Sequence, residues 1–327
     1  MSKNLVQVKK LKTYFYTGDG IVKAVDDVSF NIRKGEILGV VGESGCGKSV
    51  TAMSIMRLIP SPPGKIVAGE ILFEDENILN IKEDKMRKIR GNDIAVIFQE
   101  PMTSLNPIFT IGYQIEEVIL LHQKTSKIEA KKKAVEMLKL VGVPRADEIV
   151  NCYPHELSGG MRQRAMIAMA VSCNPKLLIA DEPTTALDVT IQAQILDIMR
   201  DLKKKLNTSI MLITHDLGVI AEMAEYVVVM YAGNVIEEAS VTELFKNPMH
   251  PYTVGLMKSK PSLDKEVDRL YSIPGQVPNP IDMPDECHFC DRCPNVMDIC
   301  RKSQPPIREI TPGHKVACFL YKDKEGK

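Results

Sequence analysis

The sequence predicts an α/β protein with a largely parallel sheet over about the first 245 residues. Short, wholly apolar runs resemble strands covered on both faces, and segments with helical spacing lie between them. Strands that alternate with helices are typical of parallel sheets, because each helix returns the chain to the same edge. A third observation, proline-rich sequence from Asn247 onward, predicts a boundary near residue 246.

The expected elements follow in order along the chain. The predicted strands are 25–32, Glu36–Val41, Ile94–Phe98, Leu177–Ala180, Ser209–Thr214 and Tyr226–Met230, the last of which is the final buried strand. The predicted helices are Lys48–Leu58, Lys127–Val141, Ile191–Leu206 and Leu217–Ala224. Lys127–Val141 carries one apolar stripe, made of Ala134, Val135, Leu138 and Val141. This helix breaks the alternation and indicates a helical insertion over about residues 100–165.

Composition limits the possible partners. The 327 residues include 42 Lys and Arg and 42 Asp and Glu, so a general electrostatic attraction to nucleic acid is not expected. No run approaches the ~18–20 apolar residues that span a bilayer, and the N-terminus lacks a signal-peptide core. We therefore expect a cytosolic protein that reaches a membrane only by docking to a partner.

The segment Gly42–Ser49 has the pattern G-x-x-x-x-G-K-[ST] of a phosphate-binding loop, or P-loop. It follows a predicted strand and precedes a predicted helix, as that motif requires. Its glycines let backbone N–H groups surround a polyphosphate, and the helix N-terminus attracts anions. Lys48 would reach the outer phosphates, and the hydroxyl of Ser49 would bind Mg²⁺. The candidate nucleotide ligands of this loop are Gly42, Glu43, Ser44, Gly45, Cys46, Gly47, Lys48 and Ser49.

A second phosphate-site element is the apolar strand that ends in Asp181 and Glu182. A carboxylate at the first position can hold Mg²⁺ through water, and one at the second can orient or deprotonate an attacking water. Such a pair is a weak signal alone, because many strands end in acidic residues. Combined with a P-loop it becomes a strong one.

Further motifs resemble those of ABC transporter ATPases, over about residues 5–245. Leu157–Met161 followed by Arg162–Arg164 resembles the family's signature motif. Gln99 matches the Q-loop, Ala186-Leu187-Asp188 the D-loop, and His215 the switch histidine. The resemblance implies a P-loop NTPase (RecA-like) core with an antiparallel N-terminal β part and a helical insertion, over residues 1–246.

The resemblance also implies roles for these residues. Ser158, Gly159 and Gly160 lie at an expected helix start and would face the γ-phosphate bound by a second subunit. Glu182 would be the catalytic base, His215 would contact the γ-phosphate, and Gln99 would touch Mg²⁺ or the attacking water. Asp188 would contact the other subunit. Mg²⁺ would be held through Ser49, Gln99 and Asp181. The adenine would stack on an upstream aromatic side chain; Tyr14, Phe15 and Tyr16 are available, and register with the family favours Phe15.

Residues 247–327 form a Pro- and Cys-rich extension that resembles the oligopeptide, dipeptide and nickel subfamily of ABC importers. Asn247–Thr253, Ser272–Pro278 and Cys287–Pro294 carry the resemblance, together with Cys300 and Gly313–Cys318. It implies a [4Fe–4S] cluster on Cys287, Cys293, Cys300 and Cys318. Cys290 departs from that pattern and creates C-x₂-C-x₂-C before Pro294, so it could replace one ligand. Zinc bound by four thiolates is the alternative, and a cytosolic setting disfavours disulfides.

Together these features predict the ATPase subunit of a prokaryotic peptide importer, peripheral to the cytoplasmic face of the membrane. Its expected partners are a second ATPase chain, similar but different or a second copy, two membrane-spanning permeases and, indirectly, an extracellular peptide-binding protein. The extension is expected to be irregular and held together by the cluster. The alternatives are the same machine carrying nickel, a soluble non-transport ABC ATPase, and an iron–sulfur electron carrier.

Overall fold

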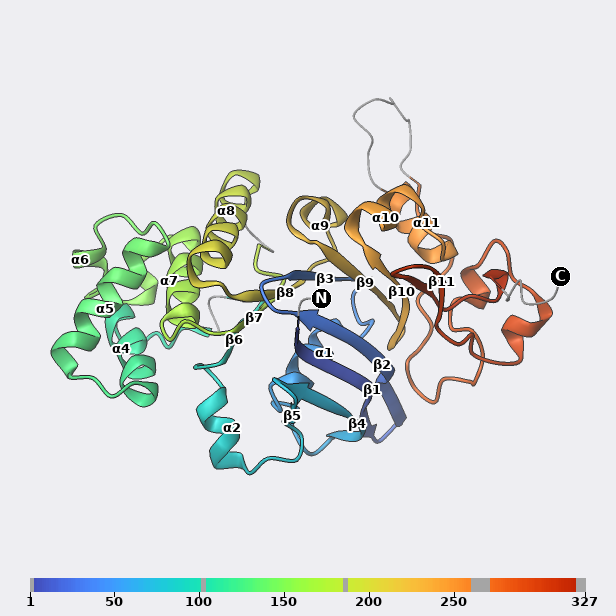
Figure 1. Cartoon of the computed structure of the whole chain (residues 1–327), viewed down its shortest axis with the longest axis horizontal. Helices are drawn as coiled ribbons and strands as arrows, with labels where there is room; N and C mark the ends of the chain where they lie inside the picture. Colours follow the sequence, from blue (N-terminus) through green and yellow to red (C-terminus); the bar gives the residue numbers. More distant parts are fainter. Residues whose placement is uncertain (1–2, 101–103, 185–187, 260–270, 322–327) are drawn as a thin grey trace. The chain divides into compact units, whose positions relative to one another are not determined.

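The computed structural model describes residues 3–100, 104–184, 188–259 and 271–321. The chain divides into two compact units, drawn with their elements in Figure 1. The first unit consists of Met1–Leu5, Ile32–Ile37 and Asn77–Ile213. The second consists of Val6–Asn31, Leu38–Glu76 and Thr214–Lys327, so the proline-rich extension belongs to the same unit as the P-loop. Each unit is described by itself below.

The first unit contains three parallel strands that carry its catalytic candidates. They are β6 (Ile94–Ile97), β7 (Leu177–Asp181) and β8 (Ser209–Ile213), with β7 in the middle. Every residue of β7 and β8 is buried. The apolar runs therefore are strands covered on both faces, as the sequence predicts.

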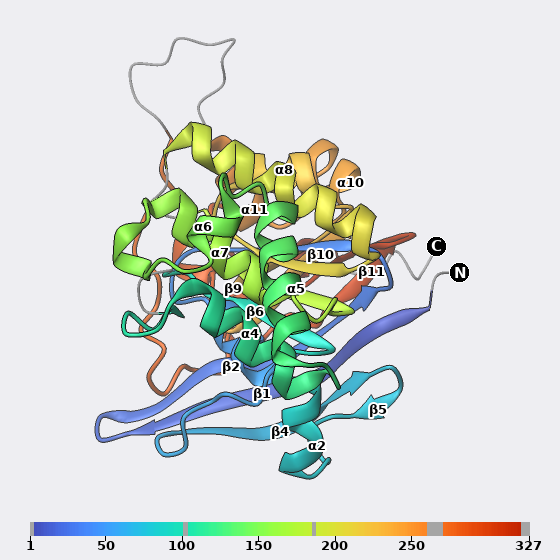
Figure 2. The ribbon, with the colours of Figure 1, turned by 90° about the vertical axis from the view of Figure 1, so that its left-hand side faces the viewer.

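The helices of the first unit include the predicted insertion. They are α2 (Glu83–Ile89), α4 (Ile111–His122), α5 (Lys127–Leu140), α6 (Ala146–Ile149), α7 (Gly159–Val171) and α8 (Val189–Leu206). Helices α4, α5 and α7 pack against one another (Figure 2). Ser126 caps α5 in a capping box with Glu129. The predicted stripe of α5 is confirmed at Ala134 and Leu138, whereas Val135 is only half-buried.

The second unit begins with an antiparallel sheet of order β2-β1-β4-β5. Its strands are β1 (Asn4–Thr17), β2 (Gly20–Arg33), β4 (Gly64–Phe73) and β5 (Glu76–Asn77). This confirms the antiparallel N-terminal part. The helix α1 (Lys48–Ile55) begins where predicted but ends three residues early, because Arg57 adopts a left-handed backbone, with φ 51°.

The remaining strands of the second unit join the core to the extension. β3 (Ile37–Val41) is parallel to β9 (Tyr226–Tyr231), and β9 is antiparallel to β10 (Asn234–Ser240). β10 pairs in turn with β12 (His314–Val316), and β12 with β11 (Arg308–Thr311). The prediction that Tyr226–Met230 is the last strand is therefore wrong. β10 was missed because its sequence contains two carboxylates, Glu237 and Glu238, that the fold buries.

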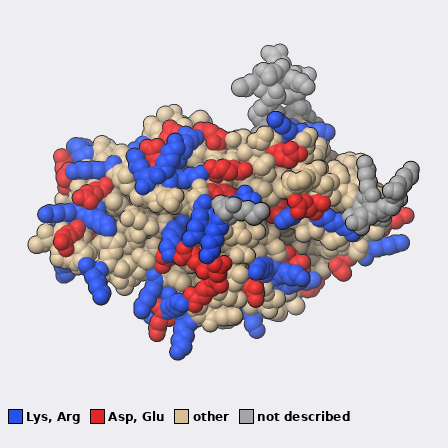
Figure 3. All heavy atoms as spheres, viewed as in Figure 1, with Lys and Arg blue, Asp and Glu red and all other residues tan. Residues whose placement is uncertain are grey.

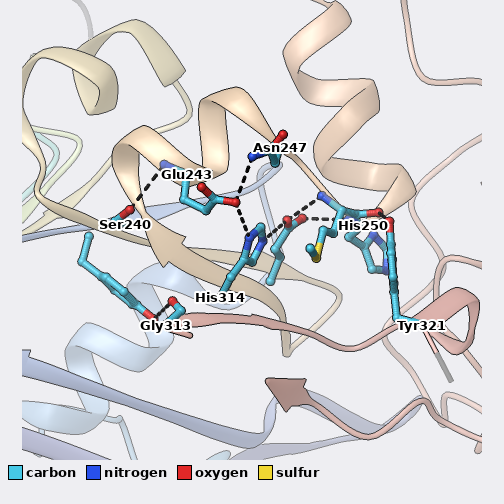
Figure 4. Close-up of polar contacts among 10 residues, drawn as sticks. Ser240, Glu243, Asn247, His250, Gly313, His314 and Tyr321 are labelled. Carbon is cyan, nitrogen blue, oxygen red and sulfur yellow. Dashed lines mark hydrogen bonds and ion pairs between the residues drawn. The ribbon is translucent and has the colours of Figure 1, made fainter. Parts of the chain in front are cut away.

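Glu237 anchors the extension through a buried polar network. Its carboxylate accepts hydrogen bonds from the backbone N–H groups of Met249 and His250, at 2.7 and 2.9 Å. Nε2 of His314, on β12, lies 2.8 Å from the same carboxylate, and the second ring nitrogen lies 3.7 Å from Glu243 (Figure 4). Neither Glu237 nor His314 is exposed to solvent. Two segments of the extension, at residues 249–250 and at His314, therefore meet at one charged side chain.

The extension also contains helix and strand, although its many prolines predicted an irregular structure. Besides β11 and β12 it forms α11 (Pro251–Lys258), and α9 (Leu217–Met223) and α10 (Val241–Lys246) precede it. Pro251 occupies the first position of α11, where the missing N–H has no intrahelical partner to lose. The expectation of a wholly irregular extension is wrong for this reason. The short 3₁₀ turns η2 (Cys290–Arg292), η3 (Asp298–Arg301) and η4 (Phe319–Tyr321) carry several of the cysteines or adjoin them.

Two surface properties bear on partners. Across the described residues, no helix combines the length and apolar character that crossing a bilayer requires. On the face in Figure 3, acidic and basic side chains are interspersed, with uncharged surface between them. This distribution agrees with the equal numbers of acidic and basic residues in the sequence.

Candidate nucleotide-binding and catalytic site

The P-loop joins β3 to α1 in the second unit, and its glycines are required by close backbone packing. A Cβ atom on Gly42 would lie 2.2 Å from the carbonyl oxygen of Met230. One on Gly47, whose φ is 99°, would lie 2.3 Å from the carbonyl oxygen of Ala24. Neither distance can hold a carbon atom, so the loop can follow this path only with glycine at both positions.

Lys48, near the end of the P-loop, has its ammonium group inside the loop. Its ammonium donates to the carbonyl oxygens of Gly42 and Glu43, at 2.8 and 3.0 Å, and its side chain is buried. A cation held in this ring of backbone groups suits an anionic ligand there. Ser49, the next residue of α1, is exposed. Burial raises the pKa of the Cys46 thiol, which therefore stays neutral. Its sulfur lies close to Gly42.

The three aromatic candidates for adenine stacking differ in their surroundings. The hydroxyl of Tyr14 donates to Asp26 at 2.8 Å, and burial together with that carboxylate raises the pKa of Tyr14 to about 12. Tyr16 is exposed. Phe15 pairs with Gly64 across β1 and β4, and its ring lies so close that a Cβ there would be 2.8 Å from Cε1. The assignment of Phe15 stays a prediction.

The predicted base and the Q-loop glutamine meet in the first unit. Gln99 follows β6, Glu182 follows β7, and the amide of Gln99 donates to the carboxylate of Glu182 at 3.1 Å. The N–H of Glu182 donates to the carbonyl oxygen of Ile213 at 2.9 Å, and its φ of 47° is uncommon outside glycine. Asp181, the last residue of β7, is buried. Neighbouring parallel strands thus bring these side chains to one edge.

The signature motif begins a helix, as predicted. Ser158 is the N-cap of α7 and accepts from the N–H of Met161 at 3.4 Å. Ser158 and Gly159 are exposed, so the amide groups at this helix start face solvent. Gln163, one turn later, is buried and donates to the carbonyl oxygen of Pro183 at 2.6 Å. The signature helix is therefore fixed to the residue that follows Glu182.

Comparisons with known proteins agree with this geometry. Residues 25–185 match the family described as ABC transporter, and residues 236–300 match the family described as oligopeptide/dipeptide transporter, C-terminal region. The oligopeptide transport ATP-binding protein AppD of Bacillus subtilis (strain 168) is 55% identical over 320 residues, which cover 98% of both chains. The chain belongs to the ABC transporter family of ATPases. OppD of Escherichia coli (strain K12), also called an oligopeptide transport ATP-binding protein, is 50% identical over 315 residues, 96% of this chain and 93% of that protein.

Solved structures show the same fold for the ATPase. The dimeric post-hydrolysis state of the ATP-binding cassette MJ0796, bound to ADP and Pi, matches with a TM-score of 0.65 and 29% identity. That match covers 72% of this chain and 98% of the other. The predicted P-loop α/β fold is thus confirmed. These comparisons do not favour the non-transport ATPase, the electron carrier or the nickel transporter.

The two remaining motifs of the ABC ATPase have local structural roles. Asp188 is the N-cap of α8 and accepts from the N–H of Ile191 at 2.9 Å, whereas Ala186 and Leu187 lie outside the described residues. His215 is exposed and belongs to the second unit, as does the P-loop. Asp216, beside it, caps α9 and accepts from Gly218 at 2.7 Å. Their roles toward nucleotide stay predictions.

The cysteines of the extension share one small cavity. Cys287, Cys290, Cys293, Cys300 and Cys318 line it, together with apolar side chains such as Phe289 and Leu320. Burial raises the pKa of Cys287 to about 12 and that of Cys318 to about 11, so these groups are thiols in the absence of a cation. Among the described residues, no three His, Cys, Asp or Glu side chains are arranged to hold a single metal ion. The iron–sulfur and zinc predictions thus have no metal site to support them.

Sequence reasoning missed two residues at the P-loop. Tyr252 and Arg292, both from the extension, hydrogen bond to Glu43. They lie in segments that the sequence had linked only to the importer subfamily. No spacing rule could pair them with a loop more than 200 residues earlier, because such contacts depend on how the chain folds.

Proposed function

We propose that this ATPase hydrolyses ATP with Mg²⁺ to power the import of di- and oligopeptides through a membrane transporter. The hydrogen bond between Gln99 and Glu182 carries the proposal for hydrolysis, since it joins the two groups that would position and activate water. Peptide cargo is supported by the names of the relatives, two of which are oligopeptide transport ATP-binding proteins matched over almost their whole length.

Within one chain, the residues divide the work as follows. The amide groups of Gly42–Ser49 and the ammonium of Lys48 bind the phosphates, while Phe15 stacks on the adenine. Ser49, Gln99 and Asp181 would hold Mg²⁺, whose charge would stabilise the negative charge that builds up on the transferred phosphate. Glu182 accepts a proton from the attacking water, and His215 contacts the γ-phosphate. The oxygen and amide donors present at these positions are those that a hard cation prefers.

Hydrolysis requires two chains. Ser158, Gly159 and Gly160 of one chain contact the γ-phosphate held by its partner's P-loop, and Asp188 contacts the partner chain. The exposed start of α7 supports this, because the N-terminus of a helix attracts an anion. Binding of ATP between the chains stabilises a closed dimer, and loss of the phosphate releases it. The partner is a similar ATPase chain or a second copy.

The ATPase acts at the cytoplasmic face of the membrane, docked to two permease subunits and supplied with cargo by an extracellular peptide-binding protein. Uptake of labelled di- and oligopeptides tests this directly. Cells that lack the chain should recover uptake with the wild type and not with Lys48→Ala. The peptide role would be contradicted if the wild type restored only nickel uptake. It would also be contradicted if a wild-type chain that hydrolyses ATP restored no uptake.

We further propose that the cysteines hold a [4Fe–4S] cluster, with zinc as the alternative. The proposal is supported by the cavity that these thiols line together, because four thiolates from one such group are the usual ligands of a [4Fe–4S] cluster. The cluster is assigned to Cys287, Cys293, Cys300 and Cys318. The Cys290 thiol lies 3.8 Å from Asp291 and 4.0 Å from Arg301, which favours its exclusion.

Bound metal would balance the negative charge of the buried thiolates and would hold the segments of the extension together. Iron and sulfide analysis with a visible absorption spectrum of anaerobically purified protein tests the assignment. Cys293→Ser should lose both iron and C-terminal protease resistance, whereas Cys290→Ser should retain them. Zinc in stoichiometric amount, or an unchanged spectrum in Cys293→Ser, would contradict the cluster.

A further inference from the structure

Glu43, the first residue after Gly42 in the P-loop, is bound by two side chains of the C-terminal extension. The guanidinium of Arg292 contacts its carboxylate in a bidentate ion pair, with Nη1 2.7 Å from Oε2 and Nη2 3.1 Å from Oε1. The backbone N–H of Glu43 donates to the hydroxyl of Tyr252 at 2.8 Å. Both the side chain and the backbone of one loop residue are therefore fixed from the extension.

Arg292 is itself held in place. Its side chain is only 6% exposed. Nε donates to the carbonyl oxygen of Pro274 at 3.0 Å, and Nη1 lies 3.3 Å from the hydroxyl of Tyr231. A planar guanidinium with this many fixed partners has little freedom to leave the carboxylate. Arg292 ends the turn η2 and directly precedes Cys293, so its position depends on the fold of the cysteine-rich segment.

Tyr252 is equally constrained. It lies on α11 and is fully buried. Its ring packs against Tyr231 and Phe289, with centroid distances of 4.7 and 5.6 Å. Its hydroxyl is thus presented to the P-loop from a rigid aromatic cluster.

The charge of Glu43 explains why such a restraint matters. A carboxylate beside a loop that binds polyphosphate repels the ligand unless a cation neutralises it. Arg292 supplies that cation from outside the loop. It also keeps the carboxylate turned toward the extension, because a bidentate pair fixes orientation as well as distance.

We propose that Arg292 and Tyr252 are positioning residues of the nucleotide site, through which the extension sets the shape and charge of the P-loop. Nucleotide affinity therefore depends on the folded state of the cysteine-rich extension. The inference rests on the proposed function only in that ATP is the ligand of the P-loop.

Equilibrium binding of a fluorescent ATP analogue to the full chain, at fixed ionic strength, tests the proposal. Arg292→Met should weaken binding by about tenfold, the usual scale for a lost charged hydrogen-bonding pair. Adding Glu43→Gln in the same chain should restore most of the affinity, because the repelling charge is then gone. A role only in folding would not be rescued by that second change. Arg301→Met is the matched control, since Arg301 makes an exposed ion pair with Asp291 in the same extension.

A second variant covers the case in which Arg292→Met does not fold. Glu43→Gln alone keeps an acceptor for Arg292 and should bind ATP as tightly as the wild type or more tightly. Weaker binding by Glu43→Gln, wild-type affinity of Arg292→Met, or absence of rescue in a folded double variant would each overturn the proposal. If instead the wild type and Lys48→Ala bound ATP equally, the ATP site itself would be misassigned, which is a different failure.

Discussion

The P-loop and the C-terminal extension belong to the same compact unit but are specified in different ways. The loop is recognisable from consecutive residues, since glycine stands at both positions, Gly42 and Gly47, where a Cβ would strike the backbone of Met230 or Ala24. The extension is fixed by pairs far apart in sequence, such as Glu237 with His314 and Glu43 with Arg292. Local constraints leave a recognisable motif, whereas long-range polar pairs do not.

The comparison predicts that motif residues control chemistry directly, whereas the buried Glu237–His314 pair of the extension controls stability. The largest effect is expected from Glu182→Gln. The amide can still contact Gln99 but cannot accept a proton, so the ATPase rate should fall by about 100-fold or more. ATP binding should persist and trap a dimer, which gel filtration with ATP would detect. The exposed Glu136→Gln on α5 is the control. A variant that hydrolyses ATP at the wild-type rate would show that another group is the base.

Glu237→Gln tests whether the buried Glu237–His314 pair stabilises the extension. Glu237 accepts from two backbone N–H groups and His314, and an amide can replace only one of its two acceptor oxygens. Breaking this buried pair should lower the free energy of unfolding by about 3 kcal/mol. Chemical denaturation with hydrogen exchange of residues 308–316 measures it.

Glu238→Gln is the matched control on the same strand. Glu238 is also buried, but it pairs with Lys315, 2.6 Å away and 38% exposed, so water can solvate the lysine that is left and the loss should be smaller than in Glu237→Gln. Equal losses in the two variants would mean that burial of the Glu237 network contributes nothing beyond an ordinary ion pair.

The smallest expected effect is a pH dependence of the same network. The hydrogen bond to Glu237 raises the pKa of His314 above its usual 6.5, with Glu243 adding to the effect on the other ring nitrogen. A raised folded-state pKa favours the charged form, so its stabilisation is complete below about pH 6.5 and is lost as pH rises through the raised value. The stability difference between wild type and His314→Gln should therefore shrink from pH 6 to pH 9 in thermal unfolding. A difference that grows with pH would contradict this sign.

Several elements show which parts of the fold can be predicted from local sequence. Buried strands such as β7 and β8 were predicted because short, wholly apolar runs are typical of strands covered on both faces. Helix α5 was predicted because its apolar residues recur at helical spacing. β10 was missed because Glu237 and Glu238 resemble a solvated segment until their partners are known. α11 was missed because Pro251 disfavours helix at every position except the first turn.

The sequence by itself determined the P-loop ATPase chemistry, because glycines, a lysine and strand-end carboxylates in fixed order allow few other interpretations. Tertiary structure alone decided which distant side chains meet: Gln99 with Glu182, Glu43 with Arg292 and Tyr252, and Glu237 with His314. The physical reason is that a hydrogen bond or ion pair between distant segments forms only once the chain has folded, so it leaves no periodic trace in the sequence; the buried charges among them, such as Glu237, also need such a partner.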